Sequence, residues 1–226
     1  MSNDIIKFSS LSNKRENEVL PLFPTPFLIT DLSDKIDEEE IKKLQDHQND
    51  KPNIISNDMN LMHNNFYILN TVLKDSGLSS LLQEKVDEFL LNILGESAKL
   101  KITQSWLNFT PKGSAHHKHR HSNSIVSGVF YVNTTPQTGH FVIEKPDFYF
   151  SQLSNMATYS TMFTQNQVQI SPKNYELFLF PSWLNHYVQF NESDETRISL
   201  SFNTFYTGII KNDLFPDNMS LTRLAL

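Results

Sequence analysis

The chain has 226 residues, with 19 Lys and Arg, 25 Asp and Glu and 8 His, which gives a formal net charge of −6. It contains no cysteine, which excludes disulfides, thiolate metal sites and a cysteine nucleophile, so that any metal must bind His, Asp or Glu. No apolar run of about 18 residues and no basic leader before an apolar stretch is visible, so we expect a soluble, cytoplasmic protein without a membrane partner. The acidic balance does not indicate a nucleic-acid partner.

The first part of the chain, about residues 1–98, predicts an edge strand, two helices and a loop. Prolines punctuate the apolar segment Leu20–Ile29, which is typical of an edge strand. Asp34 is the predicted cap of a first helix, because an acidic run and two lysines follow it. The Asn-rich segment Asp50–Asp75 is expected to be a loop with one short element. A second helix that ends at Gly95 is predicted from one apolar stripe, Leu78, Leu82, Val86, Phe89, Leu90 and Ile93.

From Lys99 onward, short strands separated by turn residues replace the helical period. The strand-like runs are Ile102–Thr110, Ile125–Asn133, His140–Glu144, Glu176–Phe180, His186–Phe190 and Arg197–Tyr206. Helices followed by many strands predict a mainly β (α+β) fold, a β-sandwich or jelly roll supported by helices on one side. We expect one domain over residues 1–226, with the jelly-roll core at about 99–206 and an unassigned tail at 207–226.

The histidines are unevenly distributed. Four of the eight lie between Ala115 and His121, and another is His186. In an extended segment residues i and i+2 share a face, so His119 and His121 can direct their imidazoles to one point. With His186 from a distant strand they would form a facial site for a divalent first-row metal. The alternatives are a polar surface turn or adventitious metal binding, and the neighbouring His116 and His117 could substitute as ligands.

The last predicted strand alternates between polar and apolar residues. Arg197, Ser199, Ser201 and Asn203 alternate with Ile198, Leu200 and Phe202. The polar face could simply face water. Inside a barrel, however, an arginine beside hydroxyl groups is suited to binding a carboxylate through two hydrogen bonds. Periodicity alone leaves both interpretations open.

Several motifs in order resemble the 2-oxoglutarate/Fe(II)-dependent oxygenase family of bacterial and phage type. They begin with Leu22-Phe23-Pro24-Thr25-Pro26 and continue with Trp106-Leu107-Asn108, Gly113, His119-Arg120-His121, Ser127-Gly128-Val129-Phe130-Tyr131-Val132, Phe180-Pro181-Ser182-Trp183-Leu184-Asn185-His186 and Arg197-Ile198-Ser199-Leu200-Ser201-Phe202-Asn203. Each fragment alone is weak, whereas the ordered set spans roughly residues 20–206 and is specific.

The resemblance implies a double-stranded β-helix with Fe(II) near one mouth and 2-oxoglutarate as cosubstrate. His119, His121 and His186 match the metal ligands, and Arg197 matches the residue that binds the far carboxylate of 2-oxoglutarate. Ser199 would be its hydrogen-bonding neighbour, while Asn108 and Tyr131 match barrel-lining positions that often contact cosubstrate or substrate. Tyr131 could equally be a core residue. The implied activity is a dioxygenase that hydroxylates an unidentified substrate with dioxygen, forming succinate and CO2.

The sequence departs from the expected pattern at three positions. His121 stands where the wider superfamily usually has a carboxylate, so the metal would keep its full charge until dianionic 2-oxoglutarate binds. Ser122 replaces an expected proline, and Tyr175 an expected glycine. A cupin-like metalloenzyme without an oxoacid and a non-catalytic jelly-roll binding protein therefore stay as alternatives. The substrate would meet the loops Lys145–Thr161 and 50–70, and the apolar tail 214–226 could pack on the barrel or form a homodimer.

Overall fold

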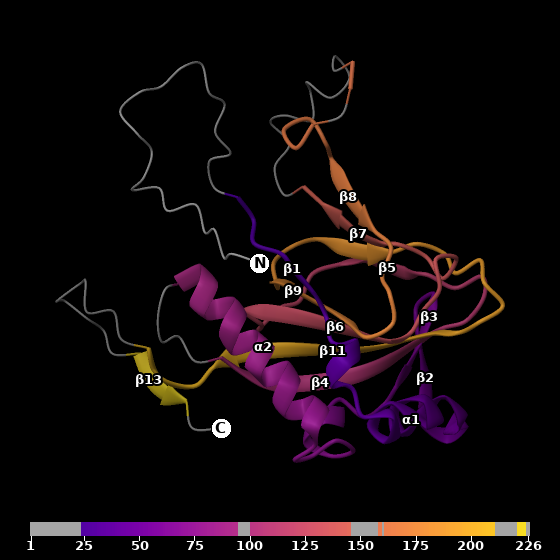
Figure 1. Cartoon of the computed structure of the whole chain (residues 1–226), viewed down its shortest axis with the longest axis horizontal. Helices are drawn as coiled ribbons and strands as arrows, with labels where there is room; N and C mark the ends of the chain where they lie inside the picture. Colours follow the sequence, from indigo (N-terminus) through magenta and orange to yellow (C-terminus); the bar gives the residue numbers. More distant parts are fainter. Residues whose placement is uncertain (1–23, 95–99, 146–157, 160, 211–220, 225–226) are drawn as a thin grey trace.

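The structure, a computed structural model, describes residues 24–94, 100–145, 158–159, 161–210 and 221–224. Its centre is a seven-stranded antiparallel sheet with the strand order β1-β9-β6-β11-β4-β3-β2 (Figure 1). A four-stranded sheet has the order β5-β10-β7-β8, and β12 pairs with β13. The strands are β1 (Leu28–Asp31), β2 (Ile54–Asn57), β3 (Asn60–His63), β4 (Leu100–Thr110), β5 (His116–His119), β6 (Val126–Asn133), β7 (Phe141–Glu144), β8 (Gln167–Ile170), β9 (Glu176–Pro181), β10 (His186–Val188), β11 (Arg197–Tyr206), β12 (Gly208–Ile210) and β13 (Leu221–Leu224).

Six of these strands confirm the predicted runs of the second half of the chain, with ends that move by one or two residues. β11 has the predicted bounds, Arg197–Tyr206. The Asn-rich segment, expected to be mainly loop, instead contains the β2–β3 hairpin and three-residue 3-10 turns at Lys51–Asn53 and Ile68–Asn70. The predicted edge strand is confirmed only as β1, which pairs with β9. Residues 20–23 lie outside the described residues, and residues 24–27 are described but do not belong to a strand. Most of the predicted tail also lies outside them.

The first helix, α1 (Glu38–Asp46), begins later than predicted. Its cap is Asp37, whose side chain accepts a hydrogen bond from the Glu39 backbone N–H at 2.9 Å. Asp34 lies in a separate 3-10 turn, Ser33–Lys35, and the following Ile36 is extended, which separates the two elements. The predicted cap at Asp34 was therefore wrong. Another 3-10 turn, His47–Asn49, follows α1 directly.

The second helix, α2 (Gly77–Leu94), packs its predicted stripe against the large sheet (Figure 1). Its first turn is capped by α1, because the Glu40 carboxylate accepts hydrogen bonds from the backbone N–H groups of Gly77 at 2.9 Å and Leu78 at 2.8 Å. Ile93, placed in the stripe by its spacing, is exposed, and Gly95 lies outside the described residues. Neither helix in the described part of the chain is long and apolar enough to cross a membrane.

The large sheet is covered on both faces, which decides how β11 is oriented. Its apolar residues Ile198, Leu200 and Phe202 belong to a core shared with α1 and α2. A second, smaller apolar cluster lies between the two sheets and contains Val129, Tyr131, Phe141, Phe178, Phe180, Leu184 and Val188. Because successive side chains alternate, the polar side chains of β11 point into the space between the sheets rather than to water.

Tyr175, found where the resemblance predicts a glycine, adopts the left-handed backbone conformation with φ of 67°. A non-glycine residue is uncommon there, which explains the expectation of glycine. Its backbone N–H donates to the Tyr131 carbonyl at 2.7 Å, and its carbonyl accepts from the Leu32 N–H at 3.1 Å. These bonds hold the turn that leads into β9.

Candidate active site

Three histidines from two neighbouring strands and a following turn meet at one point. His119 ends β5 and is paired in register with His186, the first residue of β10. His121 is held beyond the strand by its backbone N–H, which donates to the Ser182 carbonyl at 2.9 Å. One ring nitrogen from each histidine lies within 4.8 Å of the others, and the Nε2 atoms of His119 and His121 are 3.2 Å apart. The structure thus brings together the three predicted ligands.

Each of the three rings has an oxygen partner at Nδ1. The Nδ1 atom of His119 lies 2.8 Å from the His117 carbonyl, and that of His186 lies 2.9 Å from the Leu184 carbonyl. His121 Nδ1 lies 2.6 Å from Asn203 Oδ1. An Nδ1–H that donates to oxygen leaves the Nε2 lone pair free, so these contacts favour the tautomer that binds a metal through Nε2.

The surroundings keep the three imidazoles neutral. Burial lowers the pKa of His121 from 6.5 to about 4, and it lowers the pKa of His119 and, further, of His186. His186 is 3% exposed, and its ring contacts those of Phe141 and Phe180 at centroid distances of 5.3 and 4.8 Å. Neutral imidazoles that require no deprotonation are suited to bind a divalent first-row metal.

Arg197 lies on β11 in the same interior and is only 2% exposed. One terminal nitrogen donates to Thr110 Oγ1 at 3.1 Å and the other to the Thr138 carbonyl at 3.5 Å, while Nε has no hydrogen-bond partner. Among the described residues, no carboxylate lies within ion-pair distance of its guanidinium. Burial lowers its pKa from the ordinary value. A buried guanidinium with free donors fits an anionic ligand that the chain itself does not supply.

The remaining predicted residues surround Arg197 on the large sheet. Ser199 is paired in register with Asn108 on β4 and with Tyr131 on β6, and all three side chains are buried. Asn108 donates to Ser201 Oγ at 2.9 Å, but its own Oδ1 has no partner, and neither has the Tyr131 hydroxyl. Since buried polar atoms are normally satisfied, these positions fit a polar ligand between the sheets. Burial also raises the pKa of Tyr131, which keeps its hydroxyl protonated.

Sequence reasoning missed four residues that support this site. Asn203 and Ser127 both contact His121, with Ser127 Oγ 2.7 Å from its Nδ1. Thr110 and Thr138 hold Arg197. The polar alternation of β11 already contained Asn203, and the motif that begins Ser127-Gly128 already contained Ser127. Neither pattern showed that these side chains reach a histidine.

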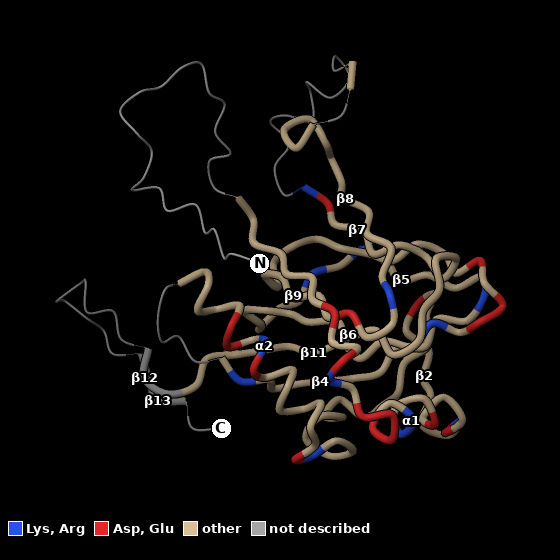
Figure 2. The backbone as a smooth tube through the Cα atoms, in the orientation of Figure 1, with Lys and Arg blue, Asp and Glu red and all other residues tan. Residues whose placement is uncertain are grey.

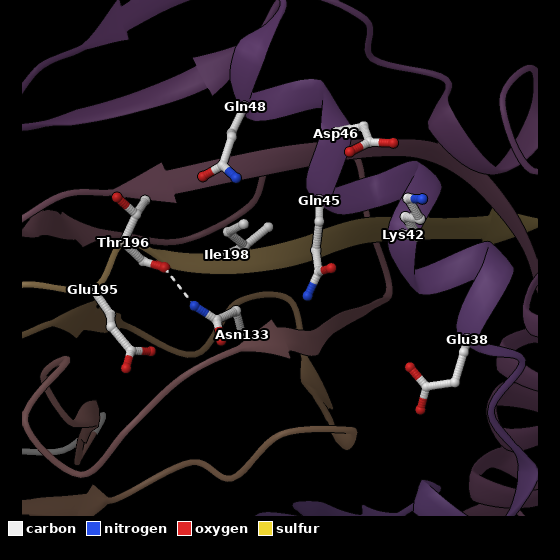
Figure 3. A pocket seen from close by; sticks show the side chains of 9 residues that line it. All are labelled: Glu38, Lys42, Gln45, Asp46, Gln48, Asn133, Glu195, Thr196 and Ile198. Carbon is white, nitrogen blue, oxygen red and sulfur yellow. Dashed lines mark hydrogen bonds between the residues drawn. The ribbon is translucent and has the colours of Figure 1, made fainter.

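A hollow of about 680 Å³ lies on the helical side of the large sheet (Figure 3). Residues of α1 line one wall, and Asn133 donates to the Thr196 carbonyl at 2.9 Å on the other. Glu38 and Asp46 of α1 belong to its lining, and Figure 2 shows acidic residues along this helix. Its lining contains Ile198, whose side chain points away from the interior that holds Arg197, and none of the candidate ligands. It is therefore separate from the histidine site.

Comparisons with known proteins agree with this geometry. Residues 104–203 match the model of a family described as "Putative 2OG-Fe(II) oxygenase". The match covers 100 of the 226 residues, from β4 to β11, and includes every candidate ligand and cosubstrate residue. Residues 104–203 are a 2OG-Fe(II) oxygenase domain. The predictions of Fe(II), 2-oxoglutarate and dioxygenase activity are confirmed for this domain at the level of its family.

Solved structures show the same fold. The non-heme alpha ketoglutarate dependent carbocyclase SnoK from nogalamycin biosynthesis is 10% identical, with a TM-score of 0.56 and 89% of each chain covered. A 2OG-Fe(II) oxygenase family oxidoreductase from Burkholderia pseudomallei is 13% identical, with a TM-score of 0.54 over 79% of this chain and 83% of that one. A prolyl-4-hydroxylase from Pseudomonas putida is 12% identical, with a TM-score of 0.52 over 80% and 94%. No curated protein sequence is significantly similar. The predicted double-stranded β-helix is confirmed.

Proposed function

We propose that the oxygenase domain hydroxylates an unidentified substrate, with His119, His121 and His186 as the ligands of Fe(II) and Arg197 as the anchor of 2-oxoglutarate. The observation that carries this assignment is the pairing of two features in one interior. Three neutral imidazoles converge on one point, and a buried guanidinium, which has no carboxylate partner in the described part of the chain, lies on the facing sheet. A dianionic oxoacid would satisfy both.

The protein's part in the reaction is to bind and orient. Arg197 would donate from its free Nε and a terminal nitrogen to the 5-carboxylate, with Ser199 beside it. Tyr131 would donate from its unpartnered hydroxyl to the cosubstrate, whereas the unpartnered Asn108 Oδ1 can only accept and would receive a hydrogen bond from a donor group of the prime substrate. When bound, Fe(II) would supply chelation of the oxoacid and the activation of dioxygen that yields succinate, CO2 and hydroxylated product.

His121 makes this site more electropositive than one with a carboxylate ligand. Three neutral ligands leave the full charge of Fe(II) in the interior, where Arg197 adds another positive charge. The dianion of 2-oxoglutarate would offset the metal charge through one end and meet Arg197 at the other. We therefore expect metal and cosubstrate to bind cooperatively, each more tightly in the presence of the other.

An anaerobic titration tests the proposal. Metal-free protein receives Fe(II) and then 2-oxoglutarate, while the weak visible charge-transfer band of the chelated oxoacid is recorded. We expect a band in the wild type, no band in His186→Ala, and an unchanged band in His47→Ala, which removes a half-buried histidine at the end of α1, outside the triad. Metal binding without a band in the wild type would contradict the oxoacid and favour the cupin-like alternative. Absence of metal binding would leave a non-catalytic jelly roll.

Three further predictions belong to this proposal. The prime substrate would enter past the segment 50–70, part of which forms the β2–β3 hairpin, and past Lys145–Thr161, most of which lies outside the described residues. The cytoplasmic location and the homodimer formed through residues 214–226 stay predictions. Size-exclusion chromatography with light scattering tests the homodimer directly: the full chain should have the mass of a dimer, and a chain truncated after residue 210 that of a monomer.

A further inference from the structure

A fourth histidine lies beside the triad and has no part in the proposed function. His116 is the first residue of β5, and its ring stacks on that of His119, with centroids 4.6 Å apart and an angle of 22° between the planes. Residues three apart in a regular strand point to opposite faces. In β5, however, His119 is paired with His186, and the next pair along the ladder joins His116 to Val188. Three steps of β5 thus lie opposite two steps of β10, and this β-bulge turns both rings to the same face.

That face of β5 is the interior between the two sheets. Val188, which is paired with His116, is 7% exposed and belongs to the smaller apolar cluster. Directly paired residues of antiparallel strands point to the same side of a sheet. His117 and Lys118, which lie within the bulge, are exposed instead. His116 therefore directs its ring into the same interior as the triad.

The course of the chain brings His116 close to the Arg197 end of that interior. Thr110, the last residue of β4, accepts a hydrogen bond from Arg197 at 3.1 Å. The short loop 111–115 joins Thr110 to His116. Asn191 holds this loop, because its side chain donates to the Thr110 carbonyl at 2.7 Å and its backbone N–H donates to a carbonyl of the loop at 2.8 Å. His116 thus borders both the triad, through its stacked ring, and the surroundings of Arg197.

The ring nitrogens of His116 are available to a ligand. In the described part of the chain neither nitrogen has a hydrogen-bond partner, whereas each ring of the triad has an oxygen at Nδ1. A metal-binding histidine almost always has such a partner at its second nitrogen, so His116 lacks a feature that the three ligands share. Burial lowers the pKa of His116 from 6.5 to about 3, and the positive charge of Arg197 acts in the same direction. The ring is therefore neutral and offers one N–H donor.

We propose that His116 is a cosubstrate-binding residue, whose ring N–H donates a hydrogen bond to the far carboxylate of 2-oxoglutarate beside Arg197. This role rests on the proposed function, because it requires a metal at the triad and a carboxylate at Arg197. An oxoacid held at both points spans the interior that His116 borders. Arg197 and Ser199 approach the carboxylate from the large sheet, and His116 would bind it from the smaller one.

His116→Phe tests this role, because phenylalanine keeps a planar ring against His119 and removes the donor. Anaerobic titration of the Fe(II)-loaded protein with 2-oxoglutarate, followed by the charge-transfer band, gives the Kd of the cosubstrate. We expect this Kd to rise about 10–100-fold, the effect of losing one hydrogen bond to a charged group. The metal Kd, measured by competition with a chelator, should stay unchanged. His116→Gln keeps a donor and should recover most of the affinity, and the matched control His117→Phe, on the exposed side of the same strand, should leave both Kd values unchanged.

A second oxoacid locates the contact. 2-Oxobutyrate has the same chelating groups as 2-oxoglutarate but lacks the far carboxylate, so its Kd should be the same for the wild type and His116→Phe. An unchanged Kd for 2-oxoglutarate in His116→Phe would overturn the role of His116, as would an equal loss of affinity for both oxoacids. A raised metal Kd would make His116 a metal ligand and would overturn it too. A metal-loaded wild type that does not bind 2-oxoglutarate would instead contradict the proposed function itself, and the role of His116 with it.

Discussion

Replacing Arg197 with methionine separates the stability of the domain from its cosubstrate affinity. The guanidinium is 2% exposed, and its Nε has no partner. Methionine has a similar length and no charge, so it fills most of the same space. Thr110, which accepts a hydrogen bond from Arg197, keeps a second one because its own hydroxyl donates to Asn60 Oδ1 at 2.9 Å. The substitution therefore leaves little of the surrounding network unsatisfied.

Without ligands, the variant should be at least as stable as the wild type. A buried donor without a partner costs about 1–3 kcal/mol, and a charged group costs more. Replacing Arg197 removes this cost and so stabilises the folded state. Loss of the hydrogen bonds to Thr110 and Thr138 offsets part of that stabilisation, which leaves a net increase of about 0–3 kcal/mol in the free energy of unfolding. For a chain of this size, 1 kcal/mol moves Tm by about 2–4 °C. We expect Tm to stay constant or to rise by up to about 10 °C.

Binding of 2-oxoglutarate should respond in the opposite direction. Two hydrogen bonds from a guanidinium to a carboxylate contribute about 1.5–3 kcal/mol each. Their loss of about 3–6 kcal/mol raises Kd by two to four orders of magnitude. At a concentration 100 times the wild-type Kd, the cosubstrate stabilises the wild type by about 2.7 kcal/mol. The same concentration should leave the Tm of Arg197→Met almost unchanged.

Thermal unfolding with and without 2-oxoglutarate, in the presence of a redox-inert metal, measures both effects. Lys112→Met is the matched control, because it removes an exposed cation that pairs with the exposed carboxylate of Asp194 at the surface. Its Tm should change by less than 2 °C, and its response to 2-oxoglutarate should be normal. A fall of more than about 5 °C in Arg197→Met would show that the arginine is structural. Equal stabilisation of variant and wild type by 2-oxoglutarate would show that another residue binds the carboxylate.

Three further predictions concern the ligands and the sheet that supports them. Asn203→Ala removes the Oδ1 acceptor of His121 Nδ1, so the Kd for the metal, measured by competition with a chelator, should rise about 10–100-fold. Asn203→Asp retains an acceptor at this position, and its Kd should stay close to that of the wild type. Gly128→Ala would place Cβ 2.1 Å from Phe202 Cζ, so it should lower the free energy of unfolding, measured in urea, by about 1–3 kcal/mol or more. The control Gly113→Ala places Cβ where no atom lies within 4 Å. Its φ of 78° is unfavourable for alanine, so this substitution should lower the free energy of unfolding by about 1 kcal/mol. Folding lowers the pKa of His121 from 6.5 to about 4, so at intermediate pH the unfolded chain binds a proton that the folded chain does not. The free energy of unfolding of the metal-free protein should therefore be highest above pH 6.5 and decrease as the pH falls toward 4. A urea midpoint that stays constant between pH 7.5 and 4.5 would contradict this.

The strands of the jelly roll could be predicted because their apolar periodicity is local. β11 shows both the strength and the limit of that signal. Its alternation fixed which residues share a face, but either face could have pointed to water. The choice depends on the helices, which cover Ile198 and Leu200 from one side, and on the smaller sheet, which closes the other side over Arg197. No pattern within ten residues contains that information.

The support of the metal ligands could not be predicted for a related reason. His121, Ser127 and Asn203 form one hydrogen-bonded group, although Asn203 is 82 residues from His121 and 76 from Ser127 in sequence. Their meeting requires the register that places Asn203 opposite Ser127 on β6. A shift of β11 by one residue would turn the Asn203 side chain to the helical face, away from Ser127 and His121. Spacing in the sequence identifies the candidate ligands, whereas the sheet register identifies what orients them.

The β2–β3 hairpin was missed because its strands have four residues each and carry polar residues. Its place in the fold comes from pairing with β4, where Leu61 lies opposite Phe109 and Met62 opposite Asn108. That pairing also brings Asp58 at the hairpin tip to within 3.5 Å of His117. The segment expected to be a loop therefore supplies the two strands at one edge of the large sheet.

The interior between the sheets is held in a conformation that costs free energy before a ligand binds. Burial keeps the three imidazoles neutral and close together, and it removes Arg197 from water without an acidic partner. The triad is attached to the smaller sheet through β5 and β10, whereas Arg197 is on the large one. Metal and oxoacid together would connect the two sheets and satisfy both unfavourable features. The fold stabilises this arrangement through the two apolar cores on either side of the large sheet rather than through contacts within the site, and the proposed ligands would supply those missing contacts.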